Sequence, residues 1–161
     1  MKPSIRIGYG YDVHQLAEET DFWLGGILIP HEKGAFGHSD ADVLLHVICD
    51  ALLGAANMRD IGHHFSDKDP KFKGIDSKIL LKNVVDMLAE KGYRVGNIDA
   101  TICLQLPKIS PYIEEMKKTI AKVMDVPVED VSIKATTTEK LGFVGEEKGV
   151  SAHAVALIYR D

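Results

Sequence analysis

An aspartate and a histidine two residues apart are the first residues whose types and spacing could do chemistry. Asp12 and His14 belong to residues 5–14, which read as an extended strand. Strand side chains alternate between faces, so both should project from the same side of a rigid support. His46, on the helix predicted next, would complete a set of two imidazoles and one carboxylate. That set is typical of a catalytic zinc site with an open fourth position, although it also holds non-haem iron.

Two further residues stand at the start of that helix. His38 could contact or orient a phosphate, or be an ordinary loop histidine. Ser39 is the predicted N-cap, and the free N–H groups of a helix N-terminus suit phosphate oxygens. Asp42, His46 and Asp50 recur every four residues, so their side chains should form a polar row along one face of the helix.

The elements that position these residues follow from the spacing of apolar residues. Strands are predicted over 4–16, 22–24, 27–29, 93–106, 131–137 and 150–159, and helices over 40–55, 77–91 and 111–124. Gly25-Gly26 is a two-residue hairpin signal, and residues 57–74 read as a loop. The chain is predicted to be a single domain over 1–161 of the α+β class, a mixed sheet with helices packed on one face. The uncovered face of the sheet should then pack in an oligomer.

The composition excludes several classes of function. The net charge is −5 and there is no basic run, which argues against nucleic-acid binding. No signal peptide and no apolar stretch of membrane-spanning length is visible, so no membrane partner is expected. Cys49 and Cys103 lie in apolar segments and are predicted to be buried free thiols, as in a cytoplasmic protein.

Three other segments each allow two interpretations. Residues 60–62 and 65–69 read as an acidic surface loop, but carboxylates there could also bind sugar hydroxyls. Residues 104–110 read as a strand-to-helix corner or as a base pocket made of backbone groups. In residues 134–143, three threonines at a strand end reflect β-propensity or form a phosphate-binding rim, where Glu139 could hold magnesium.

Taken together, several long motifs occur in a fixed order almost from end to end. They are Gly10–His14, Gly37–His46, Asp60–Gly62, Phe65–Pro70, Gln105–Lys108 and Lys134–Phe143. With these motifs the chain resembles the 2-C-methyl-D-erythritol 2,4-cyclodiphosphate synthase family, the ring-closing enzymes of the non-mevalonate isoprenoid pathway. The resemblance implies a phosphorus–oxygen lyase that converts 4-diphosphocytidyl-2-C-methyl-D-erythritol 2-phosphate to the 2,4-cyclodiphosphate and releases CMP by metal-assisted intramolecular phosphoryl transfer.

The resemblance also implies an assembly and a set of site residues. It implies a homotrimer whose sheets line the central axis and whose sites, for a small cytidine diphosphate substrate, lie between subunits. Zinc is expected on Asp12, His14 and His46, and a second divalent ion, Mg²⁺ or Mn²⁺, on Glu139. His38 and Thr137 match the catalytic residues of the family. The expected substrate-binding residues are Asp12, His14, His38, Ser39, Asp60, Ile61, Gly62, Phe65, Ser66, Asp67, Lys68, Asp69, Leu104, Gln105, Leu106, Pro107, Lys108, Ile109, Ser110, Thr136, Thr137, Thr138, Glu139 and Phe143.

Two departures and two competing functions accompany this prediction. Many relatives carry an arginine where this chain has Glu146, with Lys148 as a candidate substitute, and Ser66 stands where proline is common. The same metal site could instead activate water in a metal-dependent nucleotide phosphohydrolase. A non-catalytic, zinc-stabilised assembly module would need a closed set of four ligands, whereas the sequence supplies three evident ones.

Overall fold

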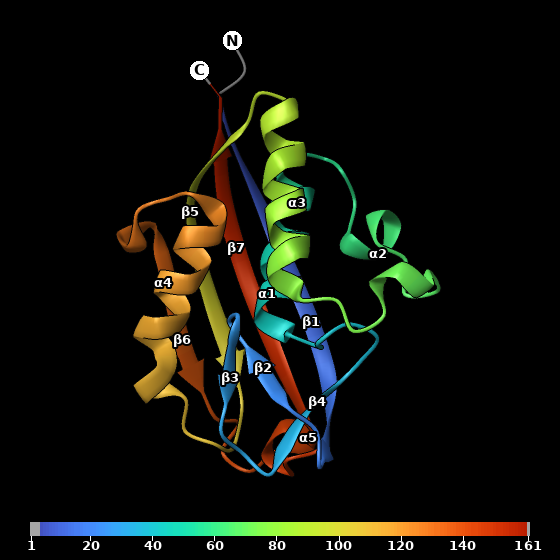
Figure 1. Cartoon of the computed structure of the whole chain (residues 1–161). Coiled ribbons are helices and arrows are strands. Elements are labelled where there is room, and N and C mark those ends of the chain that lie inside the picture. The colour runs from blue at the N-terminus through green and yellow to red at the C-terminus, as the bar shows by residue number, and fades with distance from the viewer. Residues whose placement is uncertain (1–3, 161) are drawn as a thin grey trace.

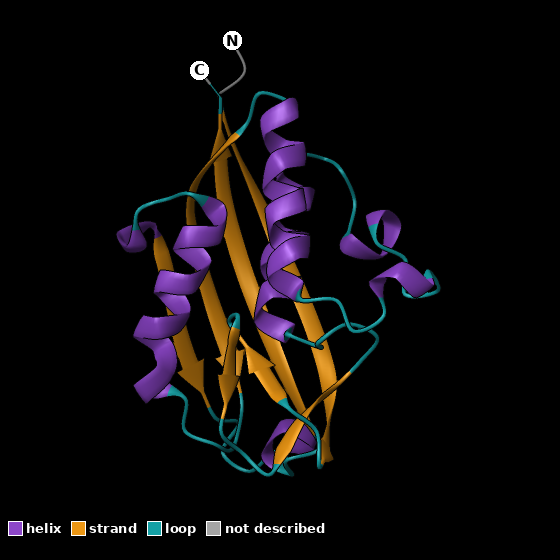
Figure 2. Ribbon diagram, viewed as in Figure 1, coloured by secondary structure: helices purple, strands orange, loops and turns teal. Residues whose placement is uncertain are grey.

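The computed structural model describes residues 4–160, which form a five-stranded sheet, a separate two-stranded hairpin and a layer of helices (Figures 1 and 2). The strands are β1 (Ile5–Glu18), β2 (Phe22–Leu24), β3 (Ile27–Ile29), β4 (Lys33–Phe36), β5 (Arg94–Cys103), β6 (Val131–Thr136) and β7 (Gly149–Tyr159). The helices are α1 (Val43–Ala55), α2 (Ile61–His64), α3 (Ser77–Glu90), α4 (Ile113–Met124) and α5 (Gly142–Gly145), with 3-10 turns η1 (Pro70–Phe72), η2 (Ser110–Tyr112) and η3 (Val128–Asp130).

The large sheet has the strand order β4-β1-β7-β5-β6. β5 and β6 run parallel, and the other neighbouring pairs are antiparallel. The predicted α+β class with a mixed sheet is therefore confirmed. The strand predictions missed β4, because Lys33-Gly34-Ala35-Phe36 is short and lacks a clear alternation.

The long helices α1, α3 and α4 cover one face of this sheet (Figure 2), as predicted. Helix α1 lies directly on β1, and the contact depends on two glycines. A Cβ atom added at Gly8 would lie 2.0 Å from the backbone oxygen of Ala51, and one at Gly10 would lie 2.3 Å from that of Val47. Only glycine permits this approach, so the helix that carries His46 is held tightly against the strand that carries Asp12.

The predicted N-cap of α1 was wrong. Asp42, not Ser39, caps the helix, because its carboxylate accepts a hydrogen bond from the N–H of Leu45. The same carboxylate accepts the N–H groups of Gly25 and Gly26, and its side chain is fully buried. Burial raises the pKa of Asp42. Asp42 therefore ties the β2–β3 hairpin to the start of α1 and has a structural role in the polar row.

The predictions for the hairpin turn, the cysteines and the segment 57–74 had mixed outcomes. The Gly25-Gly26 turn joins β2 to β3, with positive φ at both glycines. Cys49 and Cys103 are free thiols, but Cys103 is only half-buried. The segment 57–74, predicted as a loop, contains α2 and η1, which are too short to leave a periodic signal.

The other face of the sheet is not covered by α1, α3 or α4 and exposes apolar side chains. On β1 the alternate residues Ile7, Tyr9, Tyr11 and Val13 are exposed, and Tyr11 and Val13 pair with His153 and Ser151 of β7. The other members of this open face are Ile5, Val155 and Leu157. A contiguous apolar surface of this kind marks an interaction site in soluble proteins. Within residues 4–160, no helix is both long enough and apolar enough to cross a membrane.

Candidate metal and substrate site

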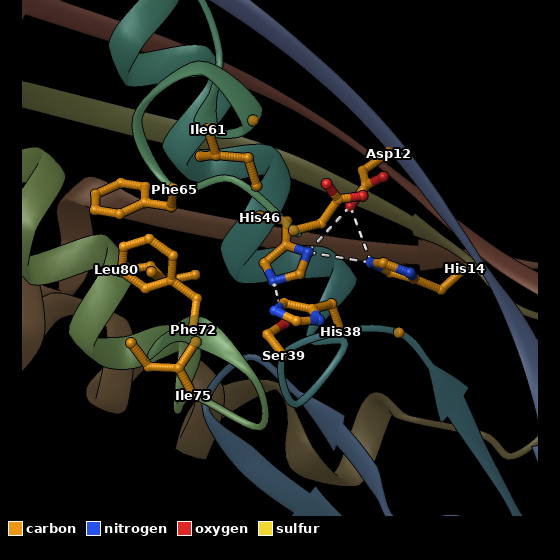
Figure 3. Close-up of a pocket in the computed structure, with 13 residues that line it drawn as sticks. Asp12, His14, His38, Ser39, His46, Ile61, Phe65, Phe72, Ile75 and Leu80 are labelled. Carbon is orange, nitrogen blue, oxygen red and sulfur yellow. Dashed lines mark hydrogen bonds and ion pairs between the residues drawn. The ribbon is translucent and has the colours of Figure 1, made fainter. Parts of the chain in front are cut away.

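Asp12, His14 and His46 converge on one point between β1 and α1 (Figure 3). The Asp12 Oδ2 atom lies 3.1 Å from His14 Nε2 and 3.3 Å from His46 Nδ1. The two imidazole nitrogens are 3.1 Å apart. Alternation along β1 turns the first two side chains toward α1, and the close helix–strand contact brings the third to them.

These three atoms fit a zinc ion. Tetrahedral zinc with bonds of about 2.0–2.1 Å places its ligand atoms roughly 3.3–3.4 Å apart. The observed separations of 3.1–3.3 Å are close to one face of that tetrahedron. Two imidazoles and a carboxylate are also a donor set that zinc accepts, with a fourth position left for another oxygen.

The charge on the site suits a dication. Burial favours the neutral form of Asp12, but its hydrogen bonds to His14 and His46 outweigh burial, and the pKa of Asp12 is lowered. Burial likewise lowers the pKa of His46, but the hydrogen bond to Asp12 outweighs it, so the pKa of His46 is raised. The other carboxylate oxygen of Asp12 accepts the N–H of Val13, which fixes the side chain. Asp12 therefore presents a charged oxygen to the two imidazoles.

A pocket of about 430 Å³ opens beside these ligands, within the usual range for a small-molecule site. Figure 3 shows His38 and Ser39 close to His46 on one side and an apolar wall on the other. Of the predicted site residues, the pocket is lined by Asp12, His14, His38, Ser39, His46, Ile61, Gly62, Phe65 and Asp67. Sequence reasoning missed Gly37 and the apolar residues Phe72, Ile75 and Leu80; the signal for Phe72 was an aromatic residue inside an otherwise polar loop.

The predicted substrate loop is anchored at both ends. At its start, Asp50 accepts the N–H of Ile61 at 2.8 Å, and burial raises the pKa of Asp50. Toward its end, His38 Nε2 lies 3.2 Å from the carbonyl oxygen of Asp69 and donates to it. Ser66 accepts the N–H of Lys68, which forms a local turn. Asp60, Ser66, Lys68 and Asp69 belong to this loop but do not line the pocket.

The segments predicted to hold cytidine lie together elsewhere. The N–H of Leu104 donates to the carbonyl of Thr136, and the N–H of Lys140 donates to the side-chain oxygen of Gln105. The hydroxyl of Thr137 accepts the N–H of Glu139, whose φ is +53°. Residues 104–110 and 136–139 therefore form one rim at the ends of β5 and β6.

This rim and the metal ligands lie on different strands of one chain. Thr136 pairs with Cys103, Cys103 with Ser151, and Ser151 with Val13. Three strand spacings amount to about 14 Å across the sheet. Within the described chain, none of residues 104–110 or 136–139 lines the pocket beside His46. The structure thus separates the two groups of predicted site residues within a protomer.

Phe143 and the Glu146 departure belong to α5 and the turn after it. Phe143 is 45% exposed and packs over Gly149, where an added Cβ would lie 2.8 Å from its ring. Glu146 forms an ion pair with Lys148. The negative charge of Glu146 is thus matched locally, and Lys148 is engaged by Glu146.

Comparisons with known proteins agree on one family. The model of the YgbB family matches residues 5–159. The 2-C-methyl-D-erythritol 2,4-cyclodiphosphate synthase of Bacteroides thetaiotaomicron is 64% identical over 98% of this chain and 99% of its own length. Among solved structures, the bifunctional IspDF of Campylobacter jejuni has a TM-score of 0.94 and 39% identity, over 98% of this chain and 42% of that longer one.

A second solved structure covers both chains almost completely. The CDP complex of IspF from Plasmodium falciparum has a TM-score of 0.86 and 35% identity, over 100% of this chain and 99% of that one. The chain therefore belongs to the YgbB family, together with relatives named 2-C-methyl-D-erythritol 2,4-cyclodiphosphate synthase.

Proposed function

We propose that this chain is a 2-C-methyl-D-erythritol 2,4-cyclodiphosphate synthase, a phosphorus–oxygen lyase. In the reaction, a 2-phosphate oxygen of 4-diphosphocytidyl-2-C-methyl-D-erythritol 2-phosphate forms a bond to the β-phosphorus. The bond from the β-phosphorus to the bridging oxygen breaks, and CMP leaves with that oxygen. The observation that carries the proposal is the convergence of Asp12, His14 and His46 on a pocket wall, in a chain of this family.

Two metal positions belong to the proposal. Asp12, His14 and His46 would hold zinc, and Glu139 would contribute to a magnesium or manganese site at the β5–β6 rim. When bound, such dications supply Lewis-acid polarisation and charge neutralisation at phosphate oxygens. The nucleophilic phosphate is already ionised at neutral pH, so the chain does not have to provide a general base.

The residues of the chain then bind and orient the substrate. His38 lies at the pocket with its Nε2–H donating to the carbonyl of Asp69, which ties it to the loop assigned to the methylerythritol phosphate. The hydroxyl of Ser39 accepts the N–H of Ala41 and lies at the pocket, where its proton is available to a phosphate oxygen whenever His46 Nε2 is protonated. The rings of Phe65 and Phe72 pack edge to face with their centroids 5.5 Å apart, and they exclude water from one side of the pocket. Positioning of this kind is worth about 7–11 kcal/mol when reacting groups are held in line.

The separation of the rim from the metal ligands supports a site shared between subunits. Within a single chain, Thr137 and Glu139 follow β6, three strands away from the β1 residues of the pocket. A neighbouring chain could bring its own rim to the pocket. The exposed apolar residues of β1 and β7 supply a surface for a homotrimer around a central axis. We therefore propose trimers in which zinc ligands come from one subunit and the cytidine rim from the next.

Product analysis tests the reaction. Incubation of the zinc- and magnesium-loaded protein with the cytidylyl substrate should yield CMP and a cyclic diphosphate in equal amounts. A linear phosphate product would instead identify a metal-dependent nucleotide phosphohydrolase, which the names of the relatives do not favour. Zinc-dependent assembly without turnover or nucleotide binding would identify a non-catalytic module.

Subunit mixing tests the shared site. His46→Ala damages the zinc half and Thr137→Ala the cytidine half, so each variant alone should be nearly inactive. In randomly mixed trimers, shared sites should restore about a quarter of wild-type activity, because about three quarters of the trimers are mixed and each mixed trimer has one intact site out of three. Sites contained within single chains would regain no activity on mixing.

A further inference from the structure

The two ring nitrogens of His46 face different partners. Nδ1 points toward Asp12 and His14, where the metal would bind. Nε2 lies 2.9 Å from the hydroxyl oxygen of Ser77 and 3.0 Å from that of Ser39. A neutral imidazole carries one proton, and only the nitrogen without it can bind a metal. Zinc binding through Nδ1 therefore requires the proton to sit on Nε2.

Asp12 works against that arrangement. Its Oδ2 atom lies 3.3 Å from Nδ1 and would accept a proton placed there. Without an opposing interaction, a carboxylate this close stabilises the tautomer that carries its proton on Nδ1, which cannot bind zinc. The partners of Nε2 therefore decide whether His46, the third proposed ligand, adopts the tautomer that can bind zinc.

Ser77 can only accept from Nε2. Its hydroxyl donates to Asp40 Oδ1 at 2.5 Å, and a carboxylate accepts but does not donate. The backbone N–H of Ser77 donates to Asp40 Oδ2 at 2.9 Å, so both oxygens of Asp40 hold the start of α3. Ser77 is completely buried, and its hydroxyl proton is committed to Asp40. The lone pair left on Ser77 Oγ requires a proton on Nε2.

Ser39 makes no such demand, although it is almost as close to Nε2. Its hydroxyl oxygen accepts the N–H of Ala41, and within residues 4–160 the hydroxyl contacts no carboxylate that would take its proton. It can therefore donate to Nε2 or accept from it. Ser77 and Ser39 lie at nearly equal distances from Nε2, but only Ser77 requires a proton on that nitrogen.

We propose that Asp40 and Ser77 are positioning residues for the metal centre, which set the tautomer of His46 through a chain of hydrogen bonds. Asp40 accepts from the Ser77 hydroxyl, Ser77 accepts from Nε2–H, and the lone pair of Nδ1 is left to face Asp12 and His14. This inference rests on the proposed zinc site and names two residues outside the predicted ligand and substrate sets. These hydrogen bonds link the loop before α1 to the first turn of α3. The packing of the two helices therefore fixes the tautomer of His46.

The experiment compares Ser77→Ala with Ser39→Ala as a matched pair. The pKa of His46 is raised, so the zinc-free protein is first brought to a pH at which its imidazole is neutral. Long-range ¹H–¹⁵N correlation spectra then report which nitrogen of His46 is protonated. Competition with a chromogenic chelator gives the zinc affinity. Ser77→Ala should populate the Nδ1–H tautomer and weaken zinc binding by about 10–100-fold, as loss of an outer partner of a metal ligand does. Ser39→Ala should retain the Nε2–H tautomer and bind zinc within about twofold of wild type.

Asp40→Ala is the second variant, since Asp40 does not touch His46. It frees the Ser77 hydroxyl to rotate, so it should shift the tautomer in the same direction as Ser77→Ala. The double variant should bind zinc about as weakly as Ser77→Ala alone, because the two residues act in one chain. Circular dichroism and the unfolding temperature of the zinc-free proteins separate a change in tautomer from a loss of fold.

Two results would overturn the proposal. One is an unchanged Nε2–H signal and zinc affinity in Ser77→Ala. The other is an equal loss in Ser39→Ala, which would mean that any hydroxyl near Nε2 suffices. The tautomer is read without metal or substrate, so the proposed cyclisation can fail in the product assay while this inference stands, and the reverse also holds.

Discussion

Gly10 lies directly under Val47, and a Cβ added at Gly10 would come within 2.3 Å of the Val47 carbonyl oxygen. Val47 follows His46 on α1, and Gly10 precedes Asp12 by two residues on β1. The distance between the strand and the helix therefore also sets the distance between Asp12 and His46, the proposed metal ligands that they carry.

Gly10→Ala should push α1 away from β1. We expect a loss of about 1–3 kcal/mol in the free energy of unfolding, because overpacking against backbone is poorly relieved. Zinc affinity should fall as well. Gly54→Ala is the matched control, since its Cβ meets nothing closer than 3.9 Å and should gain about 0.5–1 kcal/mol of helix stability. Denaturant unfolding and chelator competition measure both effects, and wild-type zinc binding in Gly10→Ala would contradict this account.

Asp42→Ala should be among the most destabilising substitutions at a charged position. It removes the helix cap and leaves the N–H groups of Leu45, Gly25 and Gly26 without their acceptor. The free energy of unfolding should fall by about 3 kcal/mol or more. Asp76→Ala removes a partly exposed cap of α3 and should cost about 1 kcal/mol. Equal losses in urea unfolding would show that burial of the cap contributes little.

His46→Ala should abolish zinc binding and CMP release while the fold is retained. Metal analysis should find about one zinc ion per wild-type chain and almost none in the variant. His63→Ala, which alters an exposed histidine of α2, should keep its zinc. Full activity of His46→Ala without zinc would refute the assigned role of the site.

Glu139→Gln should raise the magnesium concentration needed for half-maximal activity by about tenfold or more, because magnesium sites rely on one or two carboxylates. Zinc content should stay at the wild-type level, since Glu139 lies on the rim and not among the zinc ligands. A magnesium titration that superimposes on the wild-type curve would remove Glu139 as a ligand.

Tyr11→Glu should prevent trimer formation by placing a charge on the open sheet face. Ile79→Glu is a fair control, because Ile79 on α3 is 52% exposed and Tyr11 is 48% exposed. Light scattering after size-exclusion chromatography should give a monomer for the first variant and a trimer for the second. A trimeric Tyr11→Glu would place the subunit interface elsewhere.

The sequence predicted the elements and the convergence of Asp12, His14 and His46 well because both depend on local spacing. Asp12 and His14 share a face of β1 by strand alternation, and the apolar positions of α1 predicted the helix that carries His46. The cap was missed because Ser39 and Asp42 are both good capping residues. Only the fold places the N–H groups of the hairpin glycines beside Asp42.

Other parts of the site depend on strand order, which local patterns do not reveal. The sequence could not show that β7 lies between β1 and β5, and so separates Glu139 from His46 within one chain. It also could not show that Ser77 reaches His46, since these residues meet only when α3 packs on α1. Phe72 and Ile75 were missed because a short irregular segment carries no periodicity.

The two faces of strand β1 carry different functions, the proposed metal site on one and the proposed subunit interface on the other. Gly10, Asp12 and His14 face the helices, whereas Tyr9, Tyr11 and Val13 face outward. Deleting a single residue before Gly10 would invert this alternation. Asp12 and His14 would then point outward and the aromatic residues inward, so the metal site and the assembly surface would be lost together. A one-residue insertion or deletion here would exchange the inner residues for the outer ones, so this strand tolerates replacement in place better than a change of length by one residue.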